Sequence, residues 1–192
     1  MGAAVAADAV KNQKRMPLSM SVFHGQAEEF TGFHVESTGH EGPGIYFADR
    51  FRSACNYGTT VIEARIELAN PYYFYPSEDS MEAIINPELV IEVLGDEGAD
   101  VVFARLAKYG EQGYGYDVMD KLKSLGFDGL VAVHPFGTPV IPGTTGDCVI
   151  LAFDATPLRL VKIHQITEQE QEASMRVEEQ PAPSTTPARM RM

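Results

Sequence analysis

One continuous segment sets the frame of this 192-residue protein: Gly42-Pro43-Gly44-Ile45-Tyr46-Phe47-Ala48-Asp49, continuing as Arg50-Phe51-Arg52-Ser53-Ala54-Cys55-Asn56-Tyr57-Gly58. Its glycines and proline predict a hinged loop, and the apolar residues that follow predict a short strand. A helix is expected next, with Asp49 as its N-cap and Gly58 as a left-handed stop. Because the strand presents Tyr46 and the helix ends at Tyr57, a strand-to-helix turn can bring both rings to one cleft.

The rest of the chain predicts an α+β domain. A strand is expected from Ser19 to Gly25, and the clean alternation of residues 61–68 predicts a half-buried strand. The aromatic run 72–75 is expected to be an edge strand that packs its rings on the core, not a stacking platform. The other expected elements are helices at 80–94 and 97–109 broken at Gly95, a helix at 116–125, a strand at 127–133, a loop at 135–146, and strands at 147–154 and 158–166.

Composition limits the domain organisation. Residues 1–18 are an N-terminal extension, either a docked helix or a remnant of a junction with something larger, and residues 19–166 are expected to form one domain. Residues 167–192 are rich in Glu, Gln, Pro, Ser and Thr, which predicts a disordered tail.

Charge and cysteine content limit the function classes. The formal net charge of −12 argues against nucleic acid as the main partner, because affinity for phosphate backbones comes from clustered Lys and Arg. No apolar run approaches the length of a membrane span, and the N-terminus lacks a signal peptide, so we expect no membrane partner and a cytoplasmic location, or delivery into a host cell. The two cysteines, Cys55 and Cys148, have no metal-ligand spacing and are expected to be buried thiols.

Three short motifs occur in a specific order: His24-Gly25, then Gly44-Ile45-Tyr46-Phe47-Ala48-Asp49, then Asn56-Tyr57. In this order they resemble the catalytic domain of the diphtheria-toxin/poly(ADP-ribose)-polymerase branch of the ADP-ribosyltransferases, and in particular its small bacterial and phage-type members. The resemblance implies a split antiparallel β-sandwich with helices inserted between the strands of the two sheets. It also implies NAD⁺ as co-substrate, with no metal.

The chemistry of NAD⁺ explains the residue types. Cleavage of its nicotinamide–ribose bond passes through an oxocarbenium-like state, and an aromatic face can attract the cationic nicotinamide. By resemblance, Tyr57 is the stacking ring and Tyr46 packs on the other side. His24 would hold the adenosine-proximal ribose, and Gly25 would grip the carboxamide through its backbone. Ala54 is a further implied contact.

The third catalytic position departs from the pattern of the polymerising members, which place a glutamate at the start of the strand expected at 147–154. The aligned residue here is Val149, a further implied cofactor contact, and the nearest carboxylate is Asp147. Because strand side chains alternate, Asp147 and Val149 face the same way. The triad is therefore either His24, Tyr46 and Asp147, or it ends in the apolar Val149 as in mono-ADP-ribosylating relatives. Both alternatives favour attachment of a single ADP-ribose.

The resemblance thus predicts a mono-ADP-ribosyltransferase that modifies a protein acceptor, with the loop at 135–146 as the candidate acceptor contact. Two alternatives remain at this point. One is a catalytically inactive module that binds NAD⁺ or ADP-ribose. The other is an NAD-dependent RNA 2′-phosphotransferase, which would need basic residues that converge on a phosphate. The sequence does not predict the oligomeric state.

Overall fold

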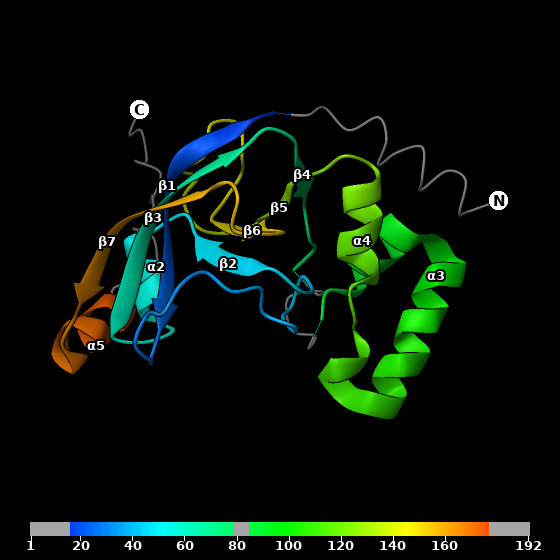
Figure 1. The fold of residues 1–192 in the computed structure, drawn as a ribbon, viewed down its shortest axis with the longest axis horizontal. Coiled ribbons are helices and arrows are strands. Elements are labelled where there is room, and N and C mark those ends of the chain that lie inside the picture. The colour runs from blue at the N-terminus through cyan, green and yellow to red at the C-terminus, as the bar shows by residue number, and fades with distance from the viewer. Residues whose placement is uncertain (1–15, 79–84, 177–192) are drawn as a thin grey trace, which may run out of the picture.

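The computed structural model describes residues 16–78 and 85–176, and within them it has seven strands and four α-helices (Figure 1). The predicted α+β class is confirmed. The elements are β1 (Leu18–Gln26), β2 (Ile45–Ala48), α2 (Phe51–Cys55), β3 (Thr60–Leu68), β4 (Pro71–Phe74), α3 (Pro87–Tyr109), the 3₁₀ helix η2 (Gly110–Gly113), α4 (Asp117–Ser124), β5 (Gly129–Val133), β6 (Cys148–Ala152), β7 (Leu158–Gln165) and α5 (Glu168–Arg176).

The strands form one hydrogen-bonded sheet in the order β4-β5-β6-β2-β1-β3-β7. β4 and β5 pair in parallel, and the other neighbours are antiparallel. The two sheets of a split sandwich are not confirmed, because the ladder is continuous. Its weakest join lies between β1 and β2, which share the single register pair Phe23 and Ala48, whereas β1 pairs with β3 along its whole length. The cavity described below opens beside this join.

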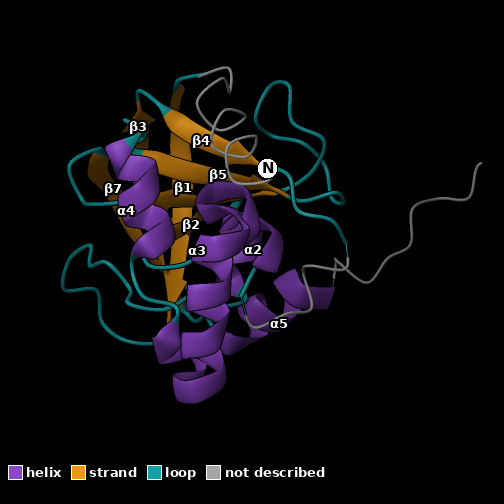
Figure 2. Cartoon of the chain, turned by 90° about the vertical axis from the view of Figure 1, so that its right-hand side faces the viewer, coloured by secondary structure: helices purple, strands orange, loops and turns teal. Residues whose placement is uncertain are grey.

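The helices α3 and α4 cover one face of the sheet (Figure 2). Leu89 of α3 and Leu122 of α4 pack there with Leu130 and Leu151 of the sheet, and all four are 0–1% exposed. Each such side chain stabilises the fold by about 1.5–3 kcal/mol. A second core lies on the opposite face, where loop residue Ile141 packs against strand residues. These two cores hold the strands that carry the site.

The aromatic run after β3 behaves as predicted. Tyr72, Tyr73 and Phe74 lie on β4, an edge strand, and are 0–4% exposed. Tyr75 is 52% exposed, but it follows the strand. The rings therefore belong to the core and do not form a stacking surface.

The predicted ends of two helices need correction. Asp49 is not the N-cap of α2; Arg50 holds that position without a side-chain hydrogen bond, and the helix ends at Cys55, before Gly58. The predicted break at Gly95 is confirmed, with φ +72° and ψ 173° inside α3. That helix begins at Pro87 and not near residue 80, because the Asn86 side chain accepts a hydrogen bond from the Leu89 N–H at 3.2 Å and caps it. Residues 79–84 lie outside the described part of the chain.

The predicted disorder is wrong for residues 168–176, which form α5. The helix is started by a capping box: the Glu170 N–H donates to the Thr167 hydroxyl oxygen, and the Thr167 N–H donates to the Glu170 carboxylate at 2.8 Å. The Gln171 amide also donates to the Cys55 carbonyl at 2.8 Å, which fixes α5 against α2. The rest of the tail and residues 1–15 lie outside the described residues. None of the helices in the described ranges has the length and apolar character needed to cross a bilayer.

Candidate functional site

A cavity of about 890 Å³ opens where the end of β1, the segment 27–41, β2, α2 and the start of β6 meet. This volume lies within the ~300–1,000 Å³ that is usual for sites of small molecules and cofactors. The structure brings all the site residues expected from the sequence to the wall of this one cavity: His24, Gly25, Tyr46, Ala54, Tyr57, Asp147 and Val149.

His24 is held in one orientation by the backbone of the neighbouring strand. Its Nδ1 lies 2.7 Å from the Tyr46 carbonyl oxygen, and its ring meets the Phe47 ring edge-on at 5.9 Å between centroids. Because a carbonyl oxygen only accepts, Nδ1 carries the proton, and Nε2 is the acceptor in the neutral ring. The site therefore presents an imidazole nitrogen that can accept a hydrogen bond from a hydroxyl group.

Gly25 is required by close packing between β1 and α2. A Cβ on this residue would lie 1.8 Å from the Ala54 carbonyl oxygen and 3.2 Å from the Tyr57 Cβ. The glycine therefore brings the end of β1 against the turn that carries Ala54 and Tyr57. Close packing is thus a second reason for glycine at this position. The first, implied by the resemblance, is that a residue without a side chain leaves its backbone free to bind the carboxamide.

The side chains of Tyr46 and Tyr57 differ in how firmly the surrounding protein holds them. The Tyr46 hydroxyl donates to the Gly42 carbonyl at 2.5 Å and accepts from the Glu41 N–H at 3.2 Å. Burial raises the pKa of Tyr46 far above its usual value, so its hydroxyl stays protonated and its ring is a fixed wall. Tyr57 is 70% exposed, so its ring can lie over a bound group. One wall is rigid and the other is adaptable.

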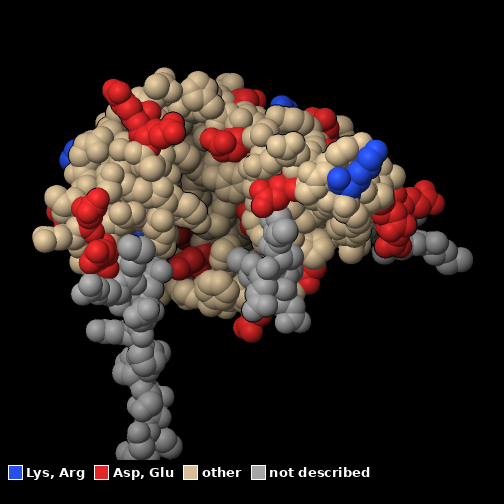
Figure 3. Space-filling model, turned by 90° about the horizontal axis from the view of Figure 1, so that it is seen from below, with Lys and Arg blue, Asp and Glu red and all other residues tan. Residues whose placement is uncertain are grey.

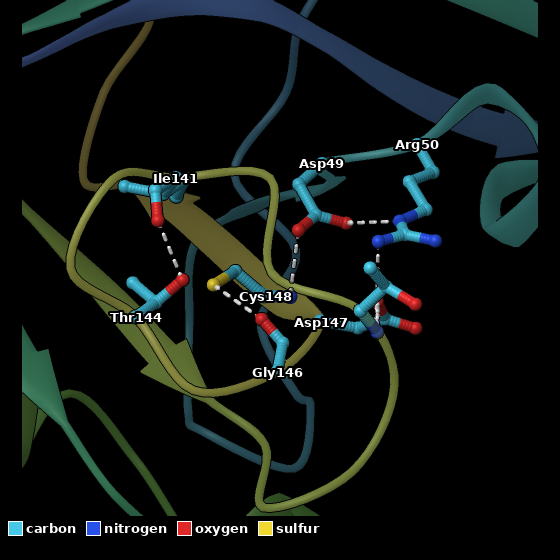
Figure 4. Close-up of polar contacts among 8 residues, drawn as sticks. Asp49, Arg50, Ile141, Thr144, Gly146, Asp147 and Cys148 are labelled. Carbon is cyan, nitrogen blue, oxygen red and sulfur yellow. Dashed lines mark hydrogen bonds and ion pairs between the residues drawn. The ribbon is translucent and has the colours of Figure 1, made fainter.

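Asp147 belongs to an ion-pair cluster at the cavity wall (Figure 4). Its Oδ1 lies 3.1 Å from Arg50 Nη2 and accepts from the Thr138 N–H at 3.1 Å. Asp49 lies on the other side of Arg50, at 4.0 Å from its Nε, and accepts from the Cys148 N–H at 3.0 Å. Asp147 thus fastens the 135–146 loop to α2, and two carboxylates share one guanidinium.

Asp49 is expected to make stability depend on pH. Burial, followed by the nearby charge of Asp147, raises the pKa of Asp49 from 3.8 to about 6 although the Cys148 N–H opposes the shift. A raised pKa favours the protonated folded state, so this contribution is complete below about pH 4 and is lost as the pH rises through 6. Relative to Asp49→Asn, the wild type should lose about 1–3 kcal/mol of unfolding free energy between pH 4 and 7. Urea unfolding of both proteins across this range checks the result, and parallel curves would contradict it.

Some cavity residues were not expected from the sequence. Glu41 is only 5% exposed, and its Oε1 lies 2.9 Å from Nδ1 of His40. His134 also lines the cavity; burial lowers its pKa, and its Nε2 has no hydrogen-bond partner within the described residues. No motif surrounds either histidine in the sequence. Only their position on the cavity wall of the folded chain identifies them.

The cavity wall is acidic. Within the described ranges no Lys or Arg lines it, and the face seen in Figure 3 has acidic side chains around its central hollow. Such a wall attracts a cationic group and repels a phosphate-rich one. Its carboxylates are those of Glu28, Glu29, Glu36, Glu41, Asp49 and Asp147.

Comparison with known proteins gives one family and one structure. A family model described as ADP-ribosyltransferase in polyvalent proteins, ART-PolyVal, matches residues 16–162. No curated protein matches the sequence. Among solved structures, the crystal structure of an anti-CRISPR protein matches at 17% identity with a TM-score of 0.38, over 75% of this chain and 96% of that chain.

Proposed function

Because the chain belongs to the ADP-ribosyltransferase family of polyvalent proteins, we propose that it transfers a single ADP-ribose from NAD⁺ to a protein acceptor. The observation that carries this proposal is the cavity itself, which collects the His-Gly pair of β1, Tyr46 of β2 and Tyr57 after α2 around one space. These groups lie on three different elements and do not belong to one hydrophobic cluster. Binding of a common ligand is therefore a reason for their side chains to lie around one cavity.

The proposed mechanism assigns each group one task. Tyr46 and Tyr57 hold the nicotinamide ring between a fixed wall and an adaptable one. His24 accepts a hydrogen bond from a ribose hydroxyl through Nε2, because its Nδ1–H is committed to the Tyr46 carbonyl. As the glycosidic bond breaks, its electron pair leaves with nicotinamide, and the acceptor forms a new bond to the ribose carbon. Orientation and electrostatics then supply the catalysis.

The acidic wall suits the cationic nicotinamide end of NAD⁺. The nicotinamide of NAD⁺ is cationic until the bond breaks, and a wall of carboxylates stabilises it. An RNA 2′-phosphotransferase would require Lys or Arg at the phosphate, and within the described residues none lines the cavity.

Two features support transfer of one ADP-ribose without extension to a polymer. Val149, at the position where polymerising members carry glutamate, is apolar and lines the cavity. Asp147, the alternative acid, is paired with Arg50 and the Thr138 N–H. For the acceptor we propose the 135–146 loop as the contact surface, because Phe136 and Val140 are 53% and 45% exposed there.

Incubation with NAD⁺ labelled in the adenylate part tests the proposal. Wild-type protein should release nicotinamide and should place label on itself or on an added protein in single units. Binding of NAD⁺ without release of nicotinamide would instead establish a binding module, and release without any labelled protein would make the activity a hydrolase.

Tyr57→Ala should weaken the use of NAD⁺ without unfolding the protein. Stacking on a cationic ring contributes about 0.5–2 kcal/mol, so the KM for NAD⁺ should rise about 2- to 30-fold. The thermal midpoint should stay close to that of the wild type because the ring is 70% exposed. Tyr109→Ala is the matched control, since Tyr109 is also exposed, at 57%, but does not line the cavity. An unchanged KM in Tyr57→Ala would remove this ring from the site.

A further inference from the structure

The cavity contains a buried carboxylate whose charge is not shared with an arginine. Asp49 and Asp147 both face Arg50. Glu41, at 5% exposure, is paired only with His40 among the described residues, through its Oε1. A carboxylate without a permanent cation is costly to bury. This distinguishes Glu41 from the other acids of the wall.

The chain around Glu41 is fixed on three sides. The Glu41 N–H donates to the Tyr46 hydroxyl at 3.2 Å, and that hydroxyl donates to the Gly42 carbonyl. The carbonyl of the preceding residue, His40, accepts from the Asn86 N–H at 2.8 Å, which joins the loop to the start of α3. The loop is therefore locked to the tyrosine that forms the fixed wall of the site and to a helix end.

Two glycines make this locking possible. A Cβ at Gly39 would lie 2.2 Å from the Tyr46 hydroxyl oxygen. Gly42 has φ +99°, and a Cβ there would lie 2.4 Å from the Tyr114 ring. A larger residue at Gly39 would push the loop away from Tyr46, and one at Gly42 would strain the backbone and push the loop away from Tyr114. Rigid support of this kind is what a precisely placed functional group needs.

The charge of Glu41 acts on groups on both sides of the cavity. After burial, it is the largest cause that raises the pKa of the Tyr46 and Tyr114 hydroxyls. It also opposes the lowering by burial of the pKa of His134, another residue of the cavity wall. Glu41 therefore lies close to the fixed tyrosine, to which its N–H donates, and lines the same cavity as His134 and Val149.

We propose that Glu41 is the catalytic carboxylate of this site and takes the place of the acid that is missing at Val149. This assignment rests on the proposed function. When the bond between the ribose C1′ and the nicotinamide nitrogen breaks, the electron pair leaves with nicotinamide, and positive charge develops on the ribose. The Glu41 carboxylate stabilises that charge until the acceptor nucleophile bonds to C1′ and its proton passes to solvent. Asp147 is then a positioning residue that fastens the loop.

Nicotinamide release by purified full-length protein tests the assignment, with wild type, Glu41→Gln, Glu41→Asp and a control, Glu67→Gln. Glu67 is an exposed residue of β3 that does not line the cavity. Glu41→Gln should lower kcat about 10²-fold with little change in KM for NAD⁺, because the interaction strengthens only in the transition state. Glu41→Asp keeps the charge and should retain at least about ten times the kcat of the glutamine variant. The control should match the wild type.

Each outcome decides between the two proposals. If wild type releases nicotinamide and Glu41→Gln stays within about threefold of it, the assignment is wrong and the proposed function stands. If Asp and Gln variants lose kcat equally, the charge is not what matters, and the assignment is again wrong. If wild type releases no nicotinamide, the proposed function fails and this assignment fails with it. Thermal unfolding of each variant identifies a misfolded protein, and for such a variant the kcat of the folded fraction is compared.

Discussion

His24→Ala should lower nicotinamide release by about 10²–10³-fold, the largest effect on activity that we expect from a single side chain of the site. The imidazole is oriented by the Tyr46 carbonyl, so its Nε2 meets the ribose at a fixed angle. A misplaced ribose loses the alignment of C1′ with the acceptor, and small displacements of this kind are costly. Stability should fall much less, by about 0.5–1.5 kcal/mol for one lost hydrogen bond.

The comparison of activity with stability is the informative part of this experiment. His164→Ala provides the matched control, because His164 also pairs with a neighbouring strand, at 3.1 Å from Glu63, and contacts an aromatic ring. It does not line the cavity. The control should keep the activity of the wild type while losing similar stability. If His24→Ala keeps more than about a third of the activity, the imidazole does not position the ribose.

The local pattern of the sequence was sufficient to predict most strands, and the family resemblance of its motifs supplied the residues that line the cavity. Alternation predicted β3, and the break at Gly95 followed from a single glycine. The His-Gly and Tyr-Phe-Ala-Asp motifs placed His24 and Tyr46 on strands that prove to lie side by side, since the His24 imidazole bonds the Tyr46 backbone. Short-range periodicity and turn chemistry are sufficient for the strands and the helix break, whereas the grouping of His24 with Tyr46 in one site followed from the resemblance.

Features that depend on tertiary contacts were not predictable. Asp49 has the right residue type and position for an N-cap, but the Cys148 N–H, 99 residues away in the chain, takes its carboxylate. The helix α5 has few apolar residues, and its contact with α2 through Gln171 could not be foreseen. Glu41 carries no motif, and only its burial beside Tyr46 makes it a candidate for catalysis.

Gly25→Ala should damage both the fold and the site, because the new methyl group would lie 1.8 Å from the Ala54 carbonyl oxygen. The neighbour is backbone and not the flexible end of a side chain, so β1 and α2 must move apart. Overpacking of this kind costs about 1–3 kcal/mol of unfolding free energy. The movement also shifts Tyr57, which follows α2, so NAD⁺ turnover should fall at least about tenfold in the fraction that remains folded.

Urea unfolding and nicotinamide release of the same preparations separate the two effects of this substitution. Ser21→Ala, on the same strand but outside the cavity wall, should change the unfolding free energy by less than about 0.5 kcal/mol and leave turnover unchanged. A Gly25→Ala protein with the stability of the wild type would show that the turn after α2 can move to make room for the methyl group at little cost in unfolding free energy. In that case the loss of turnover alone would measure how closely Tyr57 must approach the His-Gly end of β1. If turnover were also unchanged, close packing of β1 against α2 would not be needed to hold the two walls of the cavity together.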